Sequence, residues 1–255
     1  MTIQSDISIK PLTIHRELVE AFAKGPDSAG ILQGVRKLRK GRPHTPTFLF
    51  PSPKNGGHFI GCEGSLEPLM ALALELNPDI KQYRGQPIEL PGPNGRKITP
   101  DFAVDLGDGF AVIDIKPEGR LSSPRVKVRM QHIRTLLQQA HIPHFIMTEK
   151  QLCRQPFLQI RQAFKKGLGI KLTTYQRNKL LHCIDEQITT VQKLREYAIE
   201  CGFRPHIIET AAASGMLTFN LNTPWAEYSK IGVNHEHNRL STSGWGTVHD
   251  ICLPI

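Results

Sequence analysis

The sequence predicts an α/β fold in which one mixed sheet, flanked by helices, is followed by a smaller C-terminal domain. Three observations support this prediction. Between residues 65 and 150 the patterns run helix, three strands, helix and strand, an order typical of a core built on one sheet. The segment 110–116 is apolar apart from Asp114 and Lys116 and has the pattern of a buried strand. After residue 170, two helical patterns precede a strand, which indicates a winged-helix-like domain.

Each element has its own signal along the chain. Asn55-Gly56 lies between the strand patterns 47–50 and 58–60 and predicts a hairpin. Ser65 is expected to cap the first core helix, over 65–76, and Asn77-Pro78 to end it. Further strands are expected at 80–90, 98–106, 110–116, 144–147 and 216–221, and further helices at 124–140, 175–200 and 205–213.

The elements divide the chain into three parts. We expect a helical and basic arm over 1–45, the core domain over 46–165 and the winged-helix-like domain over 170–255. No apolar run approaches the roughly 18–20 residues that span a bilayer. The N-terminus lacks the basic and then apolar layout of a signal peptide, so we expect a cytoplasmic protein without a membrane partner.

The charge balance favours a polyanionic partner. Thirty-two Lys and Arg residues against 23 Asp and Glu give a net charge of +9, which is typical of proteins that bind nucleic acid. Eight basic residues and no acid occupy 150–179. Two other basic runs supply the candidate DNA contacts, which are Arg36, Lys37, Arg39, Lys40, Arg125, Lys127 and Arg129.

The candidate site begins with Pro100-Asp101 and continues with Asp114-Ile115-Lys116. In a strand, alternate side chains share a face, so Asp114 and Lys116 are expected to point away from the face of Ile113 and Ile115. An isolated Asp-x-Lys is most often a surface ion pair. Beside a buried core, an acid and a lysine cost free energy unless a metal or a phosphate compensates them.

A third acid is expected from the helix over 65–76. Glu67 lies in its first turn, where a carboxylate is also favoured by the helix dipole, and nearly all other positions are apolar. Glu63 and Glu75 are weaker candidates for the same role. Mg²⁺ prefers oxygen ligands. The expected ligands are therefore the carboxylates of Glu67, Asp101 and Asp114 and the carbonyl of Ile115, with Mn²⁺ as a substitute.

This set has the chemistry needed to cleave a phosphodiester. A bound divalent ion makes water nucleophilic and neutralises the accumulating charge. Lys116 is expected to orient the attacking water or to meet the phosphate. The expected catalytic residues are therefore Glu67, Asp101, Asp114 and Lys116.

Several segments resemble the TnsA family, the endonuclease subunits of heteromeric cut-and-paste transposases, which belong to the PD-(D/E)xK nucleases. The element order likewise matches restriction-endonuclease-like folds. The resemblance is specific over roughly 45–150 and weaker beyond. It is carried by Gly64-Ser-Leu-Glu67, Asp79-Ile-Lys-Gln-Tyr-Arg-Gly-Gln-Pro87, Thr99-Pro-Asp-Phe102, Ile113-Asp-Ile-Lys-Pro117 and His141-Ile-Pro-His-Phe-Ile-Met-Thr-Glu-Lys150.

The resemblance implies a function and a set of partners. The chain would cut the 5′ ends of a transposon, while a separate DDE-type transposase cuts and joins the 3′ ends. The C-terminal domain would contact an AAA+ ATPase regulator, and whether it binds protein, DNA or both is left open by the sequence. Glu67, Asp101 and Lys116 would be the catalytic acid, acid and lysine. Asp114 stands where the best-known TnsA pattern has a glutamine, and this departure restores the ordinary nuclease motif.

Two other interpretations share the same residues. A stand-alone restriction or repair endonuclease would cut without partners. A DNA-binding adaptor that keeps the fold would not cut at all, and the presence of all three polar groups weakens this interpretation. Metal-dependent stabilisation separates the adaptor from both nucleases.

Overall fold

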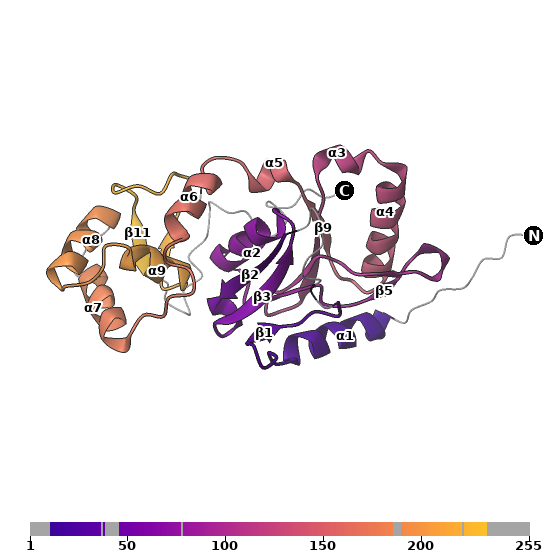
Figure 1. Ribbon diagram of the computed structural model, residues 1–255, viewed down its shortest axis with the longest axis horizontal. Coiled ribbons are helices and arrows are strands. Elements are labelled where there is room, and N and C mark those ends of the chain that lie inside the picture. Colours follow the sequence, from indigo (N-terminus) through magenta and orange to yellow (C-terminus); the bar gives the residue numbers. More distant parts are fainter. Residues whose placement is uncertain are drawn as a thin grey trace, which may run out of the picture.

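The computed structural model describes residues 11–36, 38, 46–77, 79–185, 190–220 and 222–233. Lys37, Arg39 and Lys40, three of the candidate DNA contacts, lie outside these residues. The described chain is a mixed α/β structure (Figure 1). No helix of the described part is both long and apolar enough to cross a membrane.

The centre of the structure is a four-stranded mixed sheet in the order β4-β7-β8-β9. Its strands are β4 (Gln82–Gly85), β7 (Phe102–Asp105), β8 (Phe110–Ile115) and β9 (His144–Met147). β4, β7 and β8 pair antiparallel, whereas β8 and β9 pair parallel. The predicted mixed sheet is therefore confirmed. A parallel pair needs a crossover connection, which α3 (Glu118–Leu121) and α4 (Pro124–Gln139) supply.

Both faces of this sheet are buried, each in its own hydrophobic cluster. One face packs against α2 (Glu67–Leu76), with Ala111, Ile113 and Ile115 of β8 in the cluster. The other face packs against α4 and α1 (Pro11–Ala23), with Val112 of β8 in the cluster. Because β8 is covered on both sides, any polar side chain on it must find its partners inside the protein.

A smaller three-stranded sheet lies beside α2. β2 (Thr47–Ser52) and β3 (His58–Glu63) form the predicted hairpin, and β1 (Ile31–Leu32) pairs parallel with β3. The connection passes through a short 3-10 helix (Pro53–Asn55) and then through Gly56 and Gly57, both with positive φ, so it is longer than a two-residue Asn-Gly turn. Glu75 at the far end of α2 accepts hydrogen bonds from Ser52 Oγ (2.6 Å), Tyr83 OH (2.9 Å) and Lys54 N (2.8 Å). These bonds tie α2 to the hairpin and to β4.

Two predicted core strands are interrupted. The strand expected at 80–90 consists of β4 and β5 (Leu90–Pro91), because Gln86 adopts a positive φ of 49° and Pro87 lacks an N–H. The strand expected at 98–106 consists of β6 (Lys97–Ile98) and β7, which are separated by the residues around Pro100-Asp101. Within the described residues, β5 and β6 pair with each other and with no other strand.

The helix expected to start at Ser65 starts at Glu67, and Ser65 does not cap it. Leu66 occupies the N-cap position without a side-chain hydrogen bond. Instead the Glu67 carboxylate reaches back to accept the backbone N–H of Glu63 (2.7 Å). The end at Asn77 is as predicted.

The C-terminal elements form three helices and a two-stranded antiparallel sheet (Figure 1, left). They are α7 (Thr174–Asp185), α8 (Val191–Glu200), α9 (Ile207–Ala213), β10 (Leu217–Phe219) and β11 (Ile231–Val233). The single helix expected at 175–200 is therefore wrong. The Thr190 side chain accepts the N–H of Lys193 (3.3 Å) and starts a new helix there.

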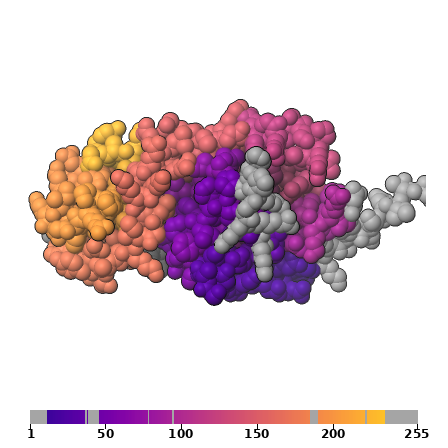
Figure 2. All heavy atoms as spheres, in the orientation of Figure 1, coloured from indigo at the N-terminus to yellow at the C-terminus, as the bar shows by residue number. Residues whose placement is uncertain are grey.

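Two short helices connect the central sheet to these elements. α5 (Glu149–Leu152) follows β9, and α6 (Phe157–Phe164) contacts α9. Phe164 stacks on Phe219 with ring centroids 5.1 Å apart, and its ring meets Trp225 edge-on at 5.0 Å. α6 lies in the range expected for the core domain but packs on the C-terminal elements. In Figure 2 this connection lies between the orange and the indigo-to-magenta parts of the surface.

Candidate active site

Backbone geometry brings Asp101, Asp114 and Lys116 together. Asp101 immediately precedes β7, and Asp114 lies near the end of β8, the neighbouring strand. Lys116 follows β8, where its N–H donates to the carbonyl of Met147 (2.9 Å). The two strands therefore present both carboxylates and the lysine at one end of the sheet.

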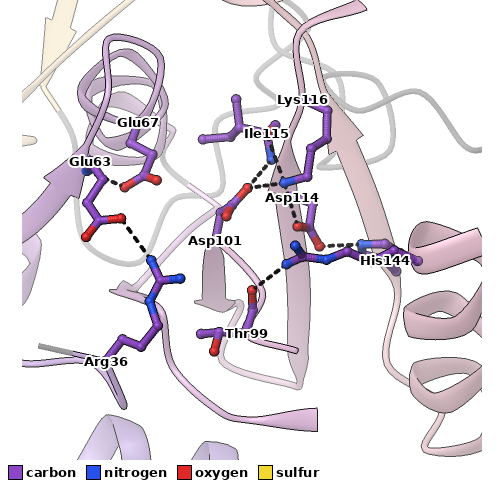
Figure 3. A network of polar contacts seen from close by, with 10 residues as sticks. Arg36, Glu63, Glu67, Thr99, Asp101, Asp114, Ile115, Lys116 and His144 are labelled. Atoms are coloured by element: carbon purple, nitrogen blue, oxygen red, sulfur yellow. Dashed lines mark hydrogen bonds and ion pairs between the residues drawn. The ribbon is translucent and has the colours of Figure 1, made fainter. Parts of the chain in front are cut away.

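The lysine joins the two aspartates. Lys116 Nζ lies 2.7 Å from Asp101 Oδ2 and 2.9 Å from Asp114 Oδ1, and it donates to the Ile115 carbonyl at 3.0 Å (Figure 3). Asp101 Oδ2 also accepts the backbone N–H of Ile115 at 2.7 Å. The predicted residues Asp101, Asp114, Ile115 and Lys116 thus form one hydrogen-bonded cluster.

Asp114 is the most enclosed member of the cluster, and its partner His144 was not anticipated from the sequence. The Asp114 side chain is 0% exposed, and its Oδ2 accepts a hydrogen bond from His144 Nε2 at 3.0 Å. His144 lies on β9 opposite Val112, on the same face as Asp114. The available signal was a polar residue opening an otherwise apolar strand at 144–147.

The fourth predicted residue, Glu67, faces Asp101 from α2. Figure 3 shows the Glu67 side chain extending from α2 toward Asp101, whose own carboxyl group is directed to Ile115 N and Lys116 Nζ. Of the two weaker candidates, Glu63 is held by an ion pair with Arg36 (2.8 Å), and Glu75 lies at the other end of α2. The structure therefore favours Glu67 over both as the third acid near the cluster.

Burial and charge perturb these groups in different directions. Burial, and then the charge of Asp101, raise the pKa of Glu67 to about 8. Burial, and then the charge of Asp114, raise the pKa of Asp101. Burial alone would raise the pKa of Asp114, but Lys116 and His144 lower it to about 2. Burial alone would lower the pKa of Lys116, but the two aspartates raise it.

Burial is the largest cause of the raised pKa of Glu67 and of Asp101, and the charge of a neighbouring carboxyl group adds to it. Asp114 is stabilised as a carboxylate by Lys116 and His144, and Asp101 shares Lys116 with it. The carboxylates of Glu67 and Asp101 and the carbonyl of Ile115 are oxygen donors of the kind that Mg²⁺ prefers. Among the described residues, no group of three or more His, Cys, Asp or Glu side chains is clustered closely enough to hold a metal ion. Lys116 instead occupies the position between the two aspartates.

The described candidate DNA contacts lie in different surroundings. Arg125 and Lys127, at the start of α4, are exposed. Arg129 is half-buried, and its Nη2 donates to the carbonyl of Thr99 (3.1 Å), two residues before Asp101. Arg36 is exposed but paired with Glu63. Among the described candidates, Arg125 and Lys127 are therefore the cations open to a ligand, and Arg129 and Arg36 border the acidic cluster.

A comparison of the sequence with models of known protein families gives no match, and a comparison with curated proteins gives none either.

Proposed function

We propose that this chain is a Mg²⁺-dependent DNA endonuclease that serves as the nuclease subunit of a heteromeric transposase and cuts the 5′ ends of the transposon. The observation that carries the proposal is Lys116 Nζ within 2.9 Å of both Asp101 and Asp114, with Glu67 facing Asp101. The mixed order β4-β7-β8-β9, with both aspartates at one end, supports the restriction-endonuclease-like interpretation.

The metal would be held by Glu67, Asp101 and the Ile115 carbonyl, with Asp114 as a further carboxylate once Lys116 releases it. When bound, Mg²⁺ or Mn²⁺ would activate water and neutralise negative charge on the phosphate. The protein supplies the remaining parts. Lys116 carries a positive charge beside the carboxylates and can donate a hydrogen bond from Nζ to a phosphate oxygen or to the attacking water. His144 holds the Asp114 carboxylate in one orientation.

The partners follow from the same proposal. Duplex DNA at the transposon ends would contact Arg125 and Lys127 beside the site. A DDE-type transposase would cut the other strands. The C-terminal elements α7–α9 with β10 and β11 would form a winged-helix-like domain that contacts an AAA+ ATPase regulator.

The test is strand-resolved cleavage of labelled transposon-end DNA in Mg²⁺, with and without the transposase encoded alongside. Glu67→Gln is the informative variant, because the amide oxygen can still accept the Glu63 N–H while the carboxylate is lost. Glu63→Gln is the matched control, since Glu63 is paired with Arg36 rather than facing Asp101. We expect 5′ cuts that need both the transposase and Glu67 and that survive in the control.

Two other outcomes have defined meanings. Cutting by the protein alone, still dependent on Glu67, would establish the second candidate, a stand-alone restriction or repair endonuclease. This candidate is favoured by the same cluster, which lies within a single chain. A lack of any Glu67-dependent cut under either condition would refute both nuclease proposals.

A further inference from the structure

The segment 150–179, which we call the basic connector, has a one-sided charge. It contains eight basic residues and no acid, and it comprises most of α5, all of α6 and the start of α7. The whole chain has 23 acids in 255 residues, so a stretch of this length would ordinarily contain two or three of them. The connector therefore departs from the mixed charge of an ordinary solvated surface.

Four cations at the centre of the connector are exposed and have no counter-ion in the described part of the chain. Arg154, Arg161, Lys165 and Lys166 are all exposed, and among the described residues none of their side chains has an ion-pair or hydrogen-bond partner. By contrast, Lys150 pairs with Glu118 (2.6 Å). The four charges are therefore not used in holding the described structure together.

The helix α6, which contains Arg161 and is followed directly by Lys165, is anchored through its apolar face. Phe157, Ile160 and Phe164 bury the apolar face of α6, and Phe164 belongs to the aromatic cluster with Phe219 and Trp225. Arg161 and Lys165 are four residues apart and therefore share the opposite, exposed side of the helix. Like charges at this spacing destabilise a helix. The helix thus presents a fixed pair of cations that repel each other unless an anion lies over them.

The connector begins beside the candidate active site. The N–H of Glu118, two residues after Lys116, donates to Glu149 at the start of α5 (2.8 Å), and Glu118 also pairs with Lys150. α5 also contacts α2, the helix that carries Glu67. In Figure 1, α3, α5 and α6 follow one another along the upper edge of the molecule. The cations therefore lead away from the site toward the C-terminal elements.

We propose that the basic connector binds the phosphate backbone of duplex DNA, on the portion that extends from the candidate site toward the C-terminal elements. This inference rests on the proposed function, in which duplex DNA is the substrate. Guanidinium and ammonium groups bind phosphate oxygens by charge-assisted hydrogen bonds and release condensed counter-ions. Four exposed cations without partners among the described residues, on a fixed helix and its flanks, have the chemistry to bind DNA independently of base sequence.

The test compares two variants of the full chain with the same change in net charge. The connector variant carries Arg154→Gln, Arg161→Gln, Lys165→Gln and Lys166→Gln. The control variant carries Lys24→Gln, Lys81→Gln, Arg96→Gln and Arg204→Gln, which are exposed cations elsewhere on the surface. Circular dichroism and thermal unfolding first establish that both fold as the wild type does. Fluorescence anisotropy then gives the Kd for two labelled duplexes over a salt series. The long duplex has about 40 base pairs, and the short one has about 12 base pairs, which is a length of about 40 Å.

For the long duplex, we expect the connector variant to raise Kd at least about tenfold and the control variant to raise it much less. The slope of log K against log salt should become shallower by about 0.9 for each phosphate that the variant no longer neutralises. The short duplex covers less of the surface and should show a smaller difference between the variants. Equal Kd values and salt slopes for the connector and control variants would overturn the inference.

The two proposals can fail separately. One outcome is DNA binding that depends on the connector together with no Glu67-dependent cleavage. This outcome would support the connector inference and refute the proposed function. Glu67-dependent cleavage with an unchanged affinity in the connector variant would do the reverse. Wild-type protein that binds no duplex even at low salt would overturn both.

Discussion

Replacing Asp114 is expected to destabilise the protein, not merely to inactivate it. The side chain is 0% exposed, and its two oxygens are paired with Lys116 Nζ at 2.9 Å and His144 Nε2 at 3.0 Å. Asp114→Ala leaves His144 without its acceptor and Lys116 with Asp101 alone among the acids. Removing one partner of a buried ion pair costs about 3–5 kcal/mol. For a chain of this size, that loss lowers Tm by roughly 10 °C.

The assay is urea unfolding followed by circular dichroism at neutral pH, with Asp114→Asn as the matched variant. Asparagine keeps the shape and can accept one of the two hydrogen bonds, so its cost is expected to be about 1–3 kcal/mol. The double variant Asp114→Ala with Lys116→Met removes both charges of the pair, and it should lose less than the two single losses added together. An Asp114→Ala protein within about 0.5 kcal/mol of the wild type would refute the reasoning, because a buried, doubly paired carboxylate cannot be removed so cheaply.

Three further changes test other parts of the structure. Burial lowers the pKa of Lys54 to about 8 despite the charges of Glu75 and Asp79, so the unfolded chain binds more protons above that pH. Urea unfolding should show stability rising between about pH 8 and 10.5, by at most about 3 kcal/mol, and Lys54→Met should abolish the rise. Phe164→Ala should cost about 3–5 kcal/mol in the same assay, and a loss under 1 kcal/mol would contradict the aromatic packing. In thermal unfolding, His144→Leu should lower the free energy of unfolding by about 1–3 kcal/mol, because it leaves Asp114 Oδ2 unpaired. His144→Gln should recover part of that loss. Equal losses in the two variants would assign His144 a packing role only.

The sequence predicted the central part of the fold because hydrophobic periodicity dominates there. The strand at 110–116, the helix at 124–140 and the strand at 144–147 all lie where the pattern placed them, apart from a residue at some ends. Each is buried along its whole length or along one helical face, so packing and local preference agree. The adjacency of Asp101, Asp114 and Lys116 followed from the same strand assignments.

Local backbone chemistry overrode the pattern in other places. The positive φ of Gln86 before Pro87 divided an apolar run that periodicity alone assigned to one strand. Thr190 began a new helix where the residue pattern continued without a break, because its hydroxyl competes for backbone N–H groups. The contact between His144 and Asp114 spans thirty residues and depends on the parallel register of β8 and β9, which one sequence does not reveal.

The helix α2 holds a buried or half-buried carboxylate at each end, and this links two distant parts of the structure mechanically. Glu75 is fixed by Ser52 and Tyr83, and Glu67 lies eight residues earlier, about 12 Å along the helix axis. Every residue from Leu69 to Leu76 is buried, so the helix has no free side on which to turn or slide. The position of Glu67 relative to Asp101 is therefore set from both ends of the helix, by the bonds of Glu75 and by the bond from Glu63 N to Glu67. A substitution at Ser52, which bonds Glu75 at the far end of α2 from Glu67, would therefore change how Glu67 faces Asp101.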